Sequence, residues 1–283
     1  MSFSSKFLRH GIAVVLLVSL TGCKNFYSNF THRTSTEYLI YDAERFIDNL
    51  QFDLAIINLD EVLSRDSTHE QALYLNSIAH SGRAGLRVIS IFETVQDGGT
   101  SNLFPMLAAS FKLMDDTGLA DFALAVDYLE TVAEDAADRT PDQNFYALFL
   151  YAGYIGAVLN RYAYNTSNTL MTANFSACHK VSNKAAVKTG IPDDGIDIIM
   201  TMIPRLIDTM DEMASSGSDT LIDTTALENL GTFSYDPIPC SANSNVVACR
   251  AVRSIVNNSS TGIGLGTGGP FGAEATVCAA VTP

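Results

Sequence analysis

Two clusters of carboxylates are the first residues of this sequence whose types and spacing could bind a metal ion. Each cluster holds three aspartates: Asp193, Asp194 and Asp197 in one, and Asp115, Asp116 and Asp121 in the other. Calcium takes oxygen ligands of this kind, but neither spacing matches the loop of an EF-hand. An aspartate at a helix start also accepts hydrogen bonds from free backbone N–H groups and interacts favourably with the helix dipole. We therefore interpret both clusters as helix caps and predict neither a metal site nor a cofactor.

Phosphate binding is the second kind of chemistry to consider, because residues 264–269 read Gly-Leu-Gly-Thr-Gly-Gly. A phosphate-binding loop would need a strand before it, a helix after it and a Lys-Ser or Lys-Thr pair, and none of these is present. We interpret 259–283 as a flexible, glycine-rich C-terminal tail. The histidines are scattered and no serine lies in a nucleophile-elbow pattern. No residue receives a catalytic assignment, and we expect no enzyme.

Cys23 ends an N-terminal segment that has three parts. Lys6 and Arg9 precede an apolar run, residues 12–20, that is too short to span a bilayer as a mature helix. The run leads into Leu20-Thr21-Gly22-Cys23. This order of basic residues, apolar run and small residues before a cysteine resembles the signal peptide and lipobox of bacterial lipoproteins.

The lipobox resemblance implies that residues 1–22 are removed and that Cys23 becomes the first residue and carries the lipid. Three acyl chains make a durable anchor, because each buried methylene contributes about 0.8 kcal/mol. Residues 23–35 would form a polar, lipidated tether. Lys24 follows the cysteine where an aspartate would favour the inner membrane, which implies a periplasm-facing lipoprotein in the outer membrane of a Gram-negative cell envelope. The alternative is an ordinary secretory signal with an incidental cysteine.

The other four cysteines are Cys178, Cys240, Cys249 and Cys278. An even number in an exported protein suggests two disulfides, with three possible connectivities. Cys240–Cys249 is the most local pair, and it would leave Cys178–Cys278 to fasten the tail to the body of the protein. Zinc is the competing interpretation, but only His179 adjoins a cysteine, and the spacings match no zinc finger or ribbon.

The overall charge limits which partners the chain can have. The formal net charge is −14, and removing Lys6 and Arg9 with the signal would make it −16. An acidic protein without basic clusters is poorly suited to nucleic acid, where neutralisation of phosphates dominates affinity. It is equally poorly suited to anionic headgroups. We therefore expect membrane attachment through the lipid alone and an unidentified envelope protein as the partner.

Apolar residues spaced three and four apart predict an all-α fold. Residues 36–50 and 52–63 each have one apolar face, and the pattern begins again at Glu70. The apolar positions are Leu39, Ala43 and Phe46 in the first helix and Phe52, Ala55, Leu59 and Val62 in the second.

Residues 36–69 resemble one tetratricopeptide repeat, whose unit is about 34 residues, and a weaker second repeat follows from 70. The resemblance implies that those seven residues pack the two helices together, and that small Ala55 lets them approach closely. Such repeats stack into a curved array whose concave face is lined by the first helices, here those beginning near Thr36 and Glu70. Leu50 and Ser67 depart from the family, which commonly has glycine and proline there. The alternative is an ordinary amphipathic hairpin.

Further helices are predicted along the rest of the chain. They span Phe104–Met114, Leu119–Ala136, Asn144–Ala163, Asp193–Met213, and the shorter stretches 223–230 and 246–256. Asn144–Ala163 is apolar nearly all round, so we expect the buried central helix of the domain and not a membrane span. Pro204 should kink its helix. We assign 36–163 to tetratricopeptide-like hairpins packed into an array or irregular helical domain, and 164–258 to additional helices with disulfide-stabilised loops.

Two functions follow from this organisation. The first is a lipid-anchored scaffold or assembly factor that binds another protein of the cell envelope. The second is a small-molecule-binding lipoprotein, because the architecture loosely resembles the tetratricopeptide lipoproteins that accompany TRAP-type transporters. In that case the helix 144–163, with Gly153 and Gly156, would border the ligand cavity.

Overall fold

The computed structural model describes residues 34–88, 107–108, 110–111, 114–163 and 190–215. All of its regular structure is helical, which confirms the all-α prediction for this part of the chain. Cys23, the four candidate disulfide cysteines and the predicted short helices 223–230 and 246–256 lie outside the described residues.

The first two described helices, α2 (Thr36–Asp48) and α3 (Phe52–Arg65), form a hairpin. Ser35 caps α2, because its hydroxyl accepts a hydrogen bond from the backbone N–H of Tyr38 at 3.2 Å. Helix α4 (Glu70–Arg83) packs on α3 next, so the predicted hairpin and the start of a third helix are confirmed.

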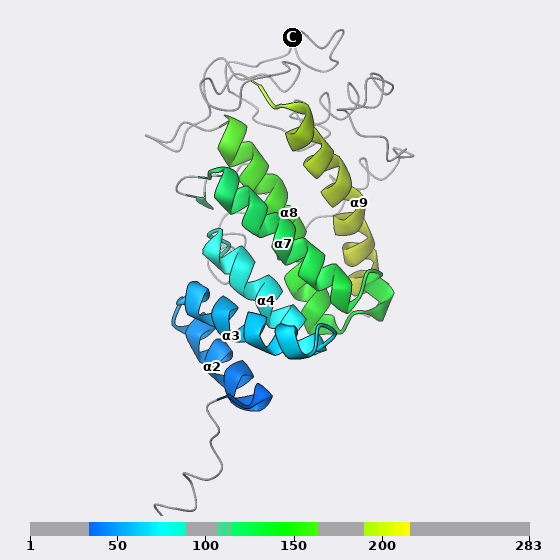
Figure 1. Cartoon of the computed structure of the whole chain (residues 1–283). Coiled ribbons are helices and arrows are strands. Elements are labelled where there is room, and N and C mark those ends of the chain that lie inside the picture. The colour runs from blue at the N-terminus through cyan, green and yellow to red at the C-terminus, as the bar shows by residue number, and fades with distance from the viewer. Residues whose placement is uncertain (1–33, 89–106, 109, 112–113, 164–189, 216–283) are drawn as a thin grey trace, which may run out of the picture.

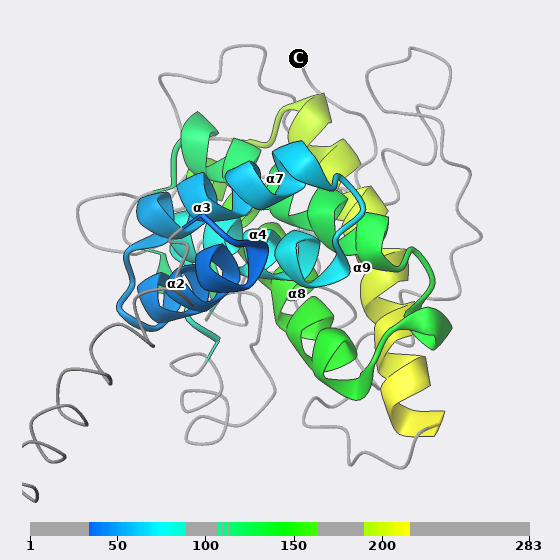
Figure 2. The same cartoon turned by 60° about the horizontal axis from the view of Figure 1, so that its bottom comes forward.

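Helices α7 (Asp116–Val132), α8 (Pro141–Ala163) and α9 (Asp193–Ser215) form the larger part of the body, and a short 3₁₀ turn, η2 (Ala136–Asp138), separates α7 from α8. Figure 1 shows α7, α8 and α9 running beside one another, with α4 against α7 and the α2–α3 hairpin below them. In the turned view of Figure 2 the hairpin comes forward, and α9 lies along the side of α8 that faces away from the hairpin. The hairpin is therefore the outermost layer at one end of the described body.

Local sequence explains where α7 and α8 begin. Asp115 caps α7, since its carboxylate accepts a hydrogen bond from the N–H of Gly118 at 2.8 Å. Pro141 is the first residue of α8, three positions before the predicted start at Asn144. Thr140 and Gln143 form a reciprocal capping box around it, with hydrogen bonds of 2.8 and 3.3 Å between backbone N–H groups and side-chain oxygens. The interpretation of Asp115 as a cap is thus confirmed.

Several predicted helices have different bounds in the structure, and the differences are largest for the helices expected over 119–136 and 104–114. The helix expected over 119–136 begins earlier, at Asp116, and ends at Val132. The guanidinium of Arg139 donates hydrogen bonds to the carbonyl oxygens of Ala133 and Glu134. These carbonyls therefore have hydrogen-bond partners without a continued helix, and α7 can end before them. In the helix expected over 104–114, residues 107, 108 and 110 are helical, but Phe111 and Met114 are not. Helix α9 continues through Pro204, and the kink there stays a prediction.

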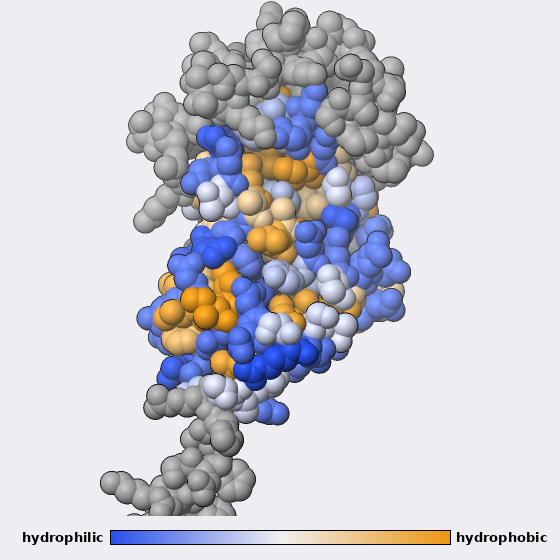
Figure 3. All heavy atoms as spheres, in the orientation of Figure 1, coloured by the Kyte–Doolittle hydropathy of each residue, from blue (hydrophilic) through white to orange (hydrophobic). Residues whose placement is uncertain are grey.

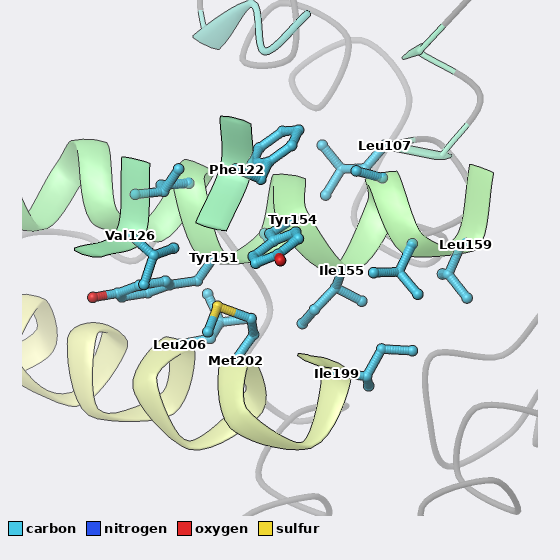
Figure 4. Close-up of a cluster of buried hydrophobic side chains, with 14 of the residues drawn as sticks. Leu107, Phe122, Val126, Tyr151, Tyr154, Ile155, Leu159, Ile199, Met202 and Leu206 are labelled. Atoms are coloured by element: carbon cyan, nitrogen blue, oxygen red, sulfur yellow. The ribbon is translucent and has the colours of Figure 1, made fainter. Parts of the chain in front are cut away.

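The buried side chains form two hydrophobic clusters. The smaller one lies between α2, α3 and the Ala72 and Ala79 side of α4, and the larger one lies around α8. Figure 4 shows Leu107 and Phe122 on one side of α8, and Ile199, Met202 and Leu206 of α9 on the other. Nearly every residue of α8 is buried, as expected for a central helix. None of the helices in the described part of the chain is both long and apolar enough to cross a membrane.

Candidate functional site

The seven predicted packing residues all contribute to the smaller hydrophobic cluster. Six are buried: Leu39, Ala43, Phe52, Ala55, Leu59 and Val62. Phe46 is only half-buried; it lies just before the turn between α2 and α3, and the guanidinium of Arg45 covers its ring at 5.4 Å. Ala55 and Ala43 have no exposed surface, in line with a close approach of the two helices.

The turn between α2 and α3 holds Leu50 in a left-handed backbone conformation. Its φ is +59°, the one positive φ of a non-glycine residue among the residues described. The turn is a Schellman motif, in which the N–H of Gln51 bonds the carbonyl of Phe46 at 2.8 Å and the N–H of Leu50 bonds that of Ile47 at 2.9 Å. Glycine adopts this conformation at little cost, whereas a leucine there is strained by about 1–2 kcal/mol.

Exposed apolar side chains concentrate at the same turn. Leu50 is 59% exposed, Leu54 44% and Ile57 63%, and they account for three of the five large hydrophobic residues that are exposed in the described part. Leu54 and Ile57 are three positions apart and so lie on the same side of α3, and Leu50 stands in the turn that leads into that helix. We call these three residues the hairpin patch. Figure 3 shows hydrophobic surface gathered where α2 ends and α3 begins.

The hairpin patch does not lie on the surface that the repeat resemblance predicts for binding. The resemblance implies contacts from the first helices of each repeat, which are α2 and α4. Of the exposed large hydrophobic residues, α2 contributes Tyr41, at 63% exposure, and α4 contributes none. The hairpin patch belongs to the second helix and to the turn before it.

A buried polar cluster joins α4 to α7. Asp121 is 4% exposed and accepts hydrogen bonds from Arg83, the shortest at 2.5 Å, while its Oδ1 lies 3.0 Å from Nδ1 of His80. Burial opposes the ionisation of Asp121, but the hydrogen bonds from Arg83 and His80 outweigh it and lower the pKa of this carboxyl. Arg83 also reaches Asp53 of α3 at 3.1 Å, so the cluster links three helices.

Hydroxyl groups beside this cluster join α4 to α8. The hydroxyl of Tyr146 lies 3.0 Å from Oγ of Ser77 and 2.9 Å from Oγ of Ser81, and Ser77 donates to the carbonyl of Ala125. Burial raises the pKa of Tyr146 well above its usual value, so the phenol stays protonated. These bonds satisfy polar groups inside a helix interface.

Serine, histidine and aspartate thus lie near one another, but their geometry is structural. The hydrogen bonds of Ser77 and Ser81 go to Tyr146 and to backbone carbonyls, and the ring of His80 stacks on Tyr128 at 5.6 Å. A nucleophile needs its base within hydrogen-bonding reach and access to substrate, and His80 is 5% exposed. This cluster fastens helices together.

The space beside the two glycines of α8 is filled by side chains. A Cβ added at Gly153 would lie 2.6 Å from Cδ1 of Leu86, and one added at Gly156 would lie 2.8 Å from Cβ of Leu107. The glycines therefore serve close packing. They leave no room at this place for the ligand cavity that the small-molecule interpretation requires.

The open clefts on the surface of the described part include two that are lined by charged or polar side chains. One, of about 520 Å³, lies between η2 and the second half of α9, and it is lined by Arg139, Arg205 and the carboxylates Glu134, Asp135, Asp208, Asp211 and Glu212. The other, of about 610 Å³, lies beside the α3–α4 turn and Gln143. No group of three or more histidine, cysteine or carboxylate side chains among the described residues is arranged to hold a metal ion.

Two features of the structure were not predicted from the sequence: the buried pair of Asp121 and His80, and the hairpin patch. Asp121 and His80 are 41 positions apart, so no local pattern connects them. The available signal was that Asp121 falls on the buried side of α7 with Ala125, where a carboxylate needs a cationic partner. Leu54 and Ile57 lie off the apolar face of α3, and this was the available signal for the hairpin patch. Comparisons with protein-family models, with curated proteins and with solved structures find no match to this chain.

Proposed function

We propose that this chain is a lipid-anchored, non-catalytic helical-repeat protein of the cell envelope that binds another envelope protein. The observation that carries the binding proposal is the hairpin patch, in which three large apolar side chains are exposed within eight residues. Fully burying a side chain of this size contributes about 1.5–3 kcal/mol. A few residues supply most of the affinity of a typical interface.

The conformation of Leu50 supports the same proposal. Its backbone would be more stable with glycine, and its side chain is 59% exposed. The leucine therefore adds little to this fold, and a contact outside the chain gives it a role. Strained residues of this kind often mark binding sites.

The anchoring proposal rests on the lipobox, Leu20-Thr21-Gly22-Cys23. A lipid on Cys23 would hold the protein at the periplasmic face of the outer membrane, and residues 24–35 would tether the helical body to it. The partner would then be a protein of the same compartment.

Metabolic labelling with palmitate, followed by separation of inner and outer membranes, tests the anchor. The full chain should be labelled and recovered with the outer membrane, and Cys23→Ser should lose both properties. Cys240→Ser is the control and should keep the label. Unlabelled full-length protein, or label that persists in Cys23→Ser, would refute lipidation at this residue.

Chemical crosslinking in native envelopes tests the scaffold proposal. One dominant protein crosslinked to the full chain is the expected result. An abundant, folded protein that crosslinks to no other protein would contradict it.

A further inference from the structure

The hairpin that carries the patch is strongly acidic. Residues 36–66 contain eight carboxylates and two arginines, a formal charge of −6 within 31 residues. Asp53 and Glu61 stand four positions before and four positions after Ile57, so they share its side of α3. Both carboxylates remain open to solvent, with 79% and 53% of their side chains exposed, even though Arg83 and Arg65 contact them.

We infer that the hairpin patch binds an amphipathic helix of another protein, whose apolar face is flanked by lysines or arginines. This inference rests on the proposed function and names the chemistry of the partner. Leu54 and Ile57 form an exposed apolar stripe along one side of α3, with Leu50 in the turn before it, and the apolar face of an amphipathic helix is a common partner of such a surface. Basic residues beside those anchors would meet the carboxylates of α3, and such complementarity selects the partner.

The same charges argue against other occupants. A second copy of this chain would bring an identical acidic patch against the first, and like charges across an interface cost several kcal/mol. Anionic lipid headgroups would be repelled in the same way. A partner helix flanked by acidic residues would lack the favourable contacts between basic side chains and the carboxylates of α3.

A pair of synthetic peptides tests the inference. Both are amphipathic helices with the same leucine face, one flanked by lysines and the other by glutamates. Binding of each labelled peptide to the full chain in a non-ionic detergent is measured by fluorescence anisotropy. The lysine peptide should bind at least about tenfold more tightly than the glutamate peptide, and its affinity should fall as salt screens the charges.

Variants then locate the binding site. The double variant Leu54→Ser, Ile57→Ser should weaken the lysine peptide by at least about tenfold. Leu124→Ser is the matched control, because Leu124 is an exposed leucine, 41% accessible, on α7. It should leave the affinity unchanged. All three side chains are exposed, so circular dichroism should show that each variant folds like the original chain.

Several results would overturn the inference. These are equal affinity for the two peptides, no binding of either, or no effect of the double variant. Loss of a homodimer in the double variant, seen by sedimentation, would assign the patch to a second copy. An envelope partner that crosslinks only outside the patch would refute this inference and leave the scaffold proposal standing.

Discussion

Leu50 has a backbone conformation that favours glycine and a side chain that is exposed to solvent. Its φ of +59° suits glycine, and its exposed side chain makes no large contribution to the core. Glycine would remove the strain but would also lose more conformational freedom on folding.

Replacing Leu50 by glycine should therefore raise the free energy of unfolding by about 0.5–1 kcal/mol. Leu50→Ala is the matched control, because alanine removes the exposed side chain but keeps the Cβ that causes the strain. It should change stability little. Urea unfolding of both variants measures the difference, and equal stabilities for glycine and alanine would contradict the strained turn.

Asp121 is the second residue whose surroundings predict a measurable effect. Burial alone would raise the pKa of this carboxyl, but the hydrogen bonds from Arg83 and His80 lower it in the folded state below the ordinary value of 3.8. A lowered pKa stabilises the folded state above the unfolded pKa, and this stabilisation is lost as the pH falls through the folded pKa.

Asp121→Asn should reduce the free energy of unfolding at pH 7 by about 1.5–3 kcal/mol, because hydrogen bonds to a buried charge are lost. The difference from the original chain should stay constant down to about pH 4 and shrink below it. Asp127→Asn, at an exposed position of the same helix, is the control and should have little effect. A difference that persists unchanged to pH 2.5 would show that Asp121 does not act through its charge.

At the scale of the elements, α8 depends on close contact at its glycines. At Gly156 an added methyl group would meet Cβ of Leu107 and, at 3.2 Å, the backbone nitrogen of Ala108, neither of which can rotate away. At Gly153 it would meet a terminal methyl group of Leu86, which can move to another rotamer.

Gly156→Ala should consequently destabilise the protein by about 1–3 kcal/mol through overpacking. Gly153→Ala should be nearly neutral, because the gain in helix propensity, about 1 kcal/mol, offsets the smaller clash. Thermal unfolding of the two variants makes the comparison. If alanine were stabilising at both positions, there would be free space beside α8, and the small-molecule interpretation would regain support.

The elements could be predicted where local sequence decides them. Asp115 as a cap is such a local signal, and it is confirmed. Pro141, which suits a first helical turn, likewise begins α8. The end of α7 could not be predicted in this way, because it depends on Arg139, several residues farther on, which binds the carbonyls of Ala133 and Glu134 just after the helix. The exposure of Leu54 and Ile57 likewise depends on which helices pack against α3, and periodicity does not contain that information.

At the scale of the whole molecule, α4 couples two hydrophobic clusters of different size. Its Ala72 and Ala79 face the hairpin, while Tyr74 and Ile78 pack against the larger cluster around α8. The buried pair of His80 and Asp121 fixes α4 to α7. A body packed in this way would present the hairpin patch at one end, where a partner could reach it.

We propose that the hairpin patch contacts another protein of the cell envelope. Site-specific photo-crosslinking in native envelopes tests it most directly, with a photoreactive residue in place of Ile57 and, as the control, in place of Leu124. We predict one dominant crosslinked protein from position 57, joined through a peptide that contains apolar and basic residues, and no such product from position 124. Equal products from the two positions, or none from position 57, would show that the hairpin patch is not the contact surface.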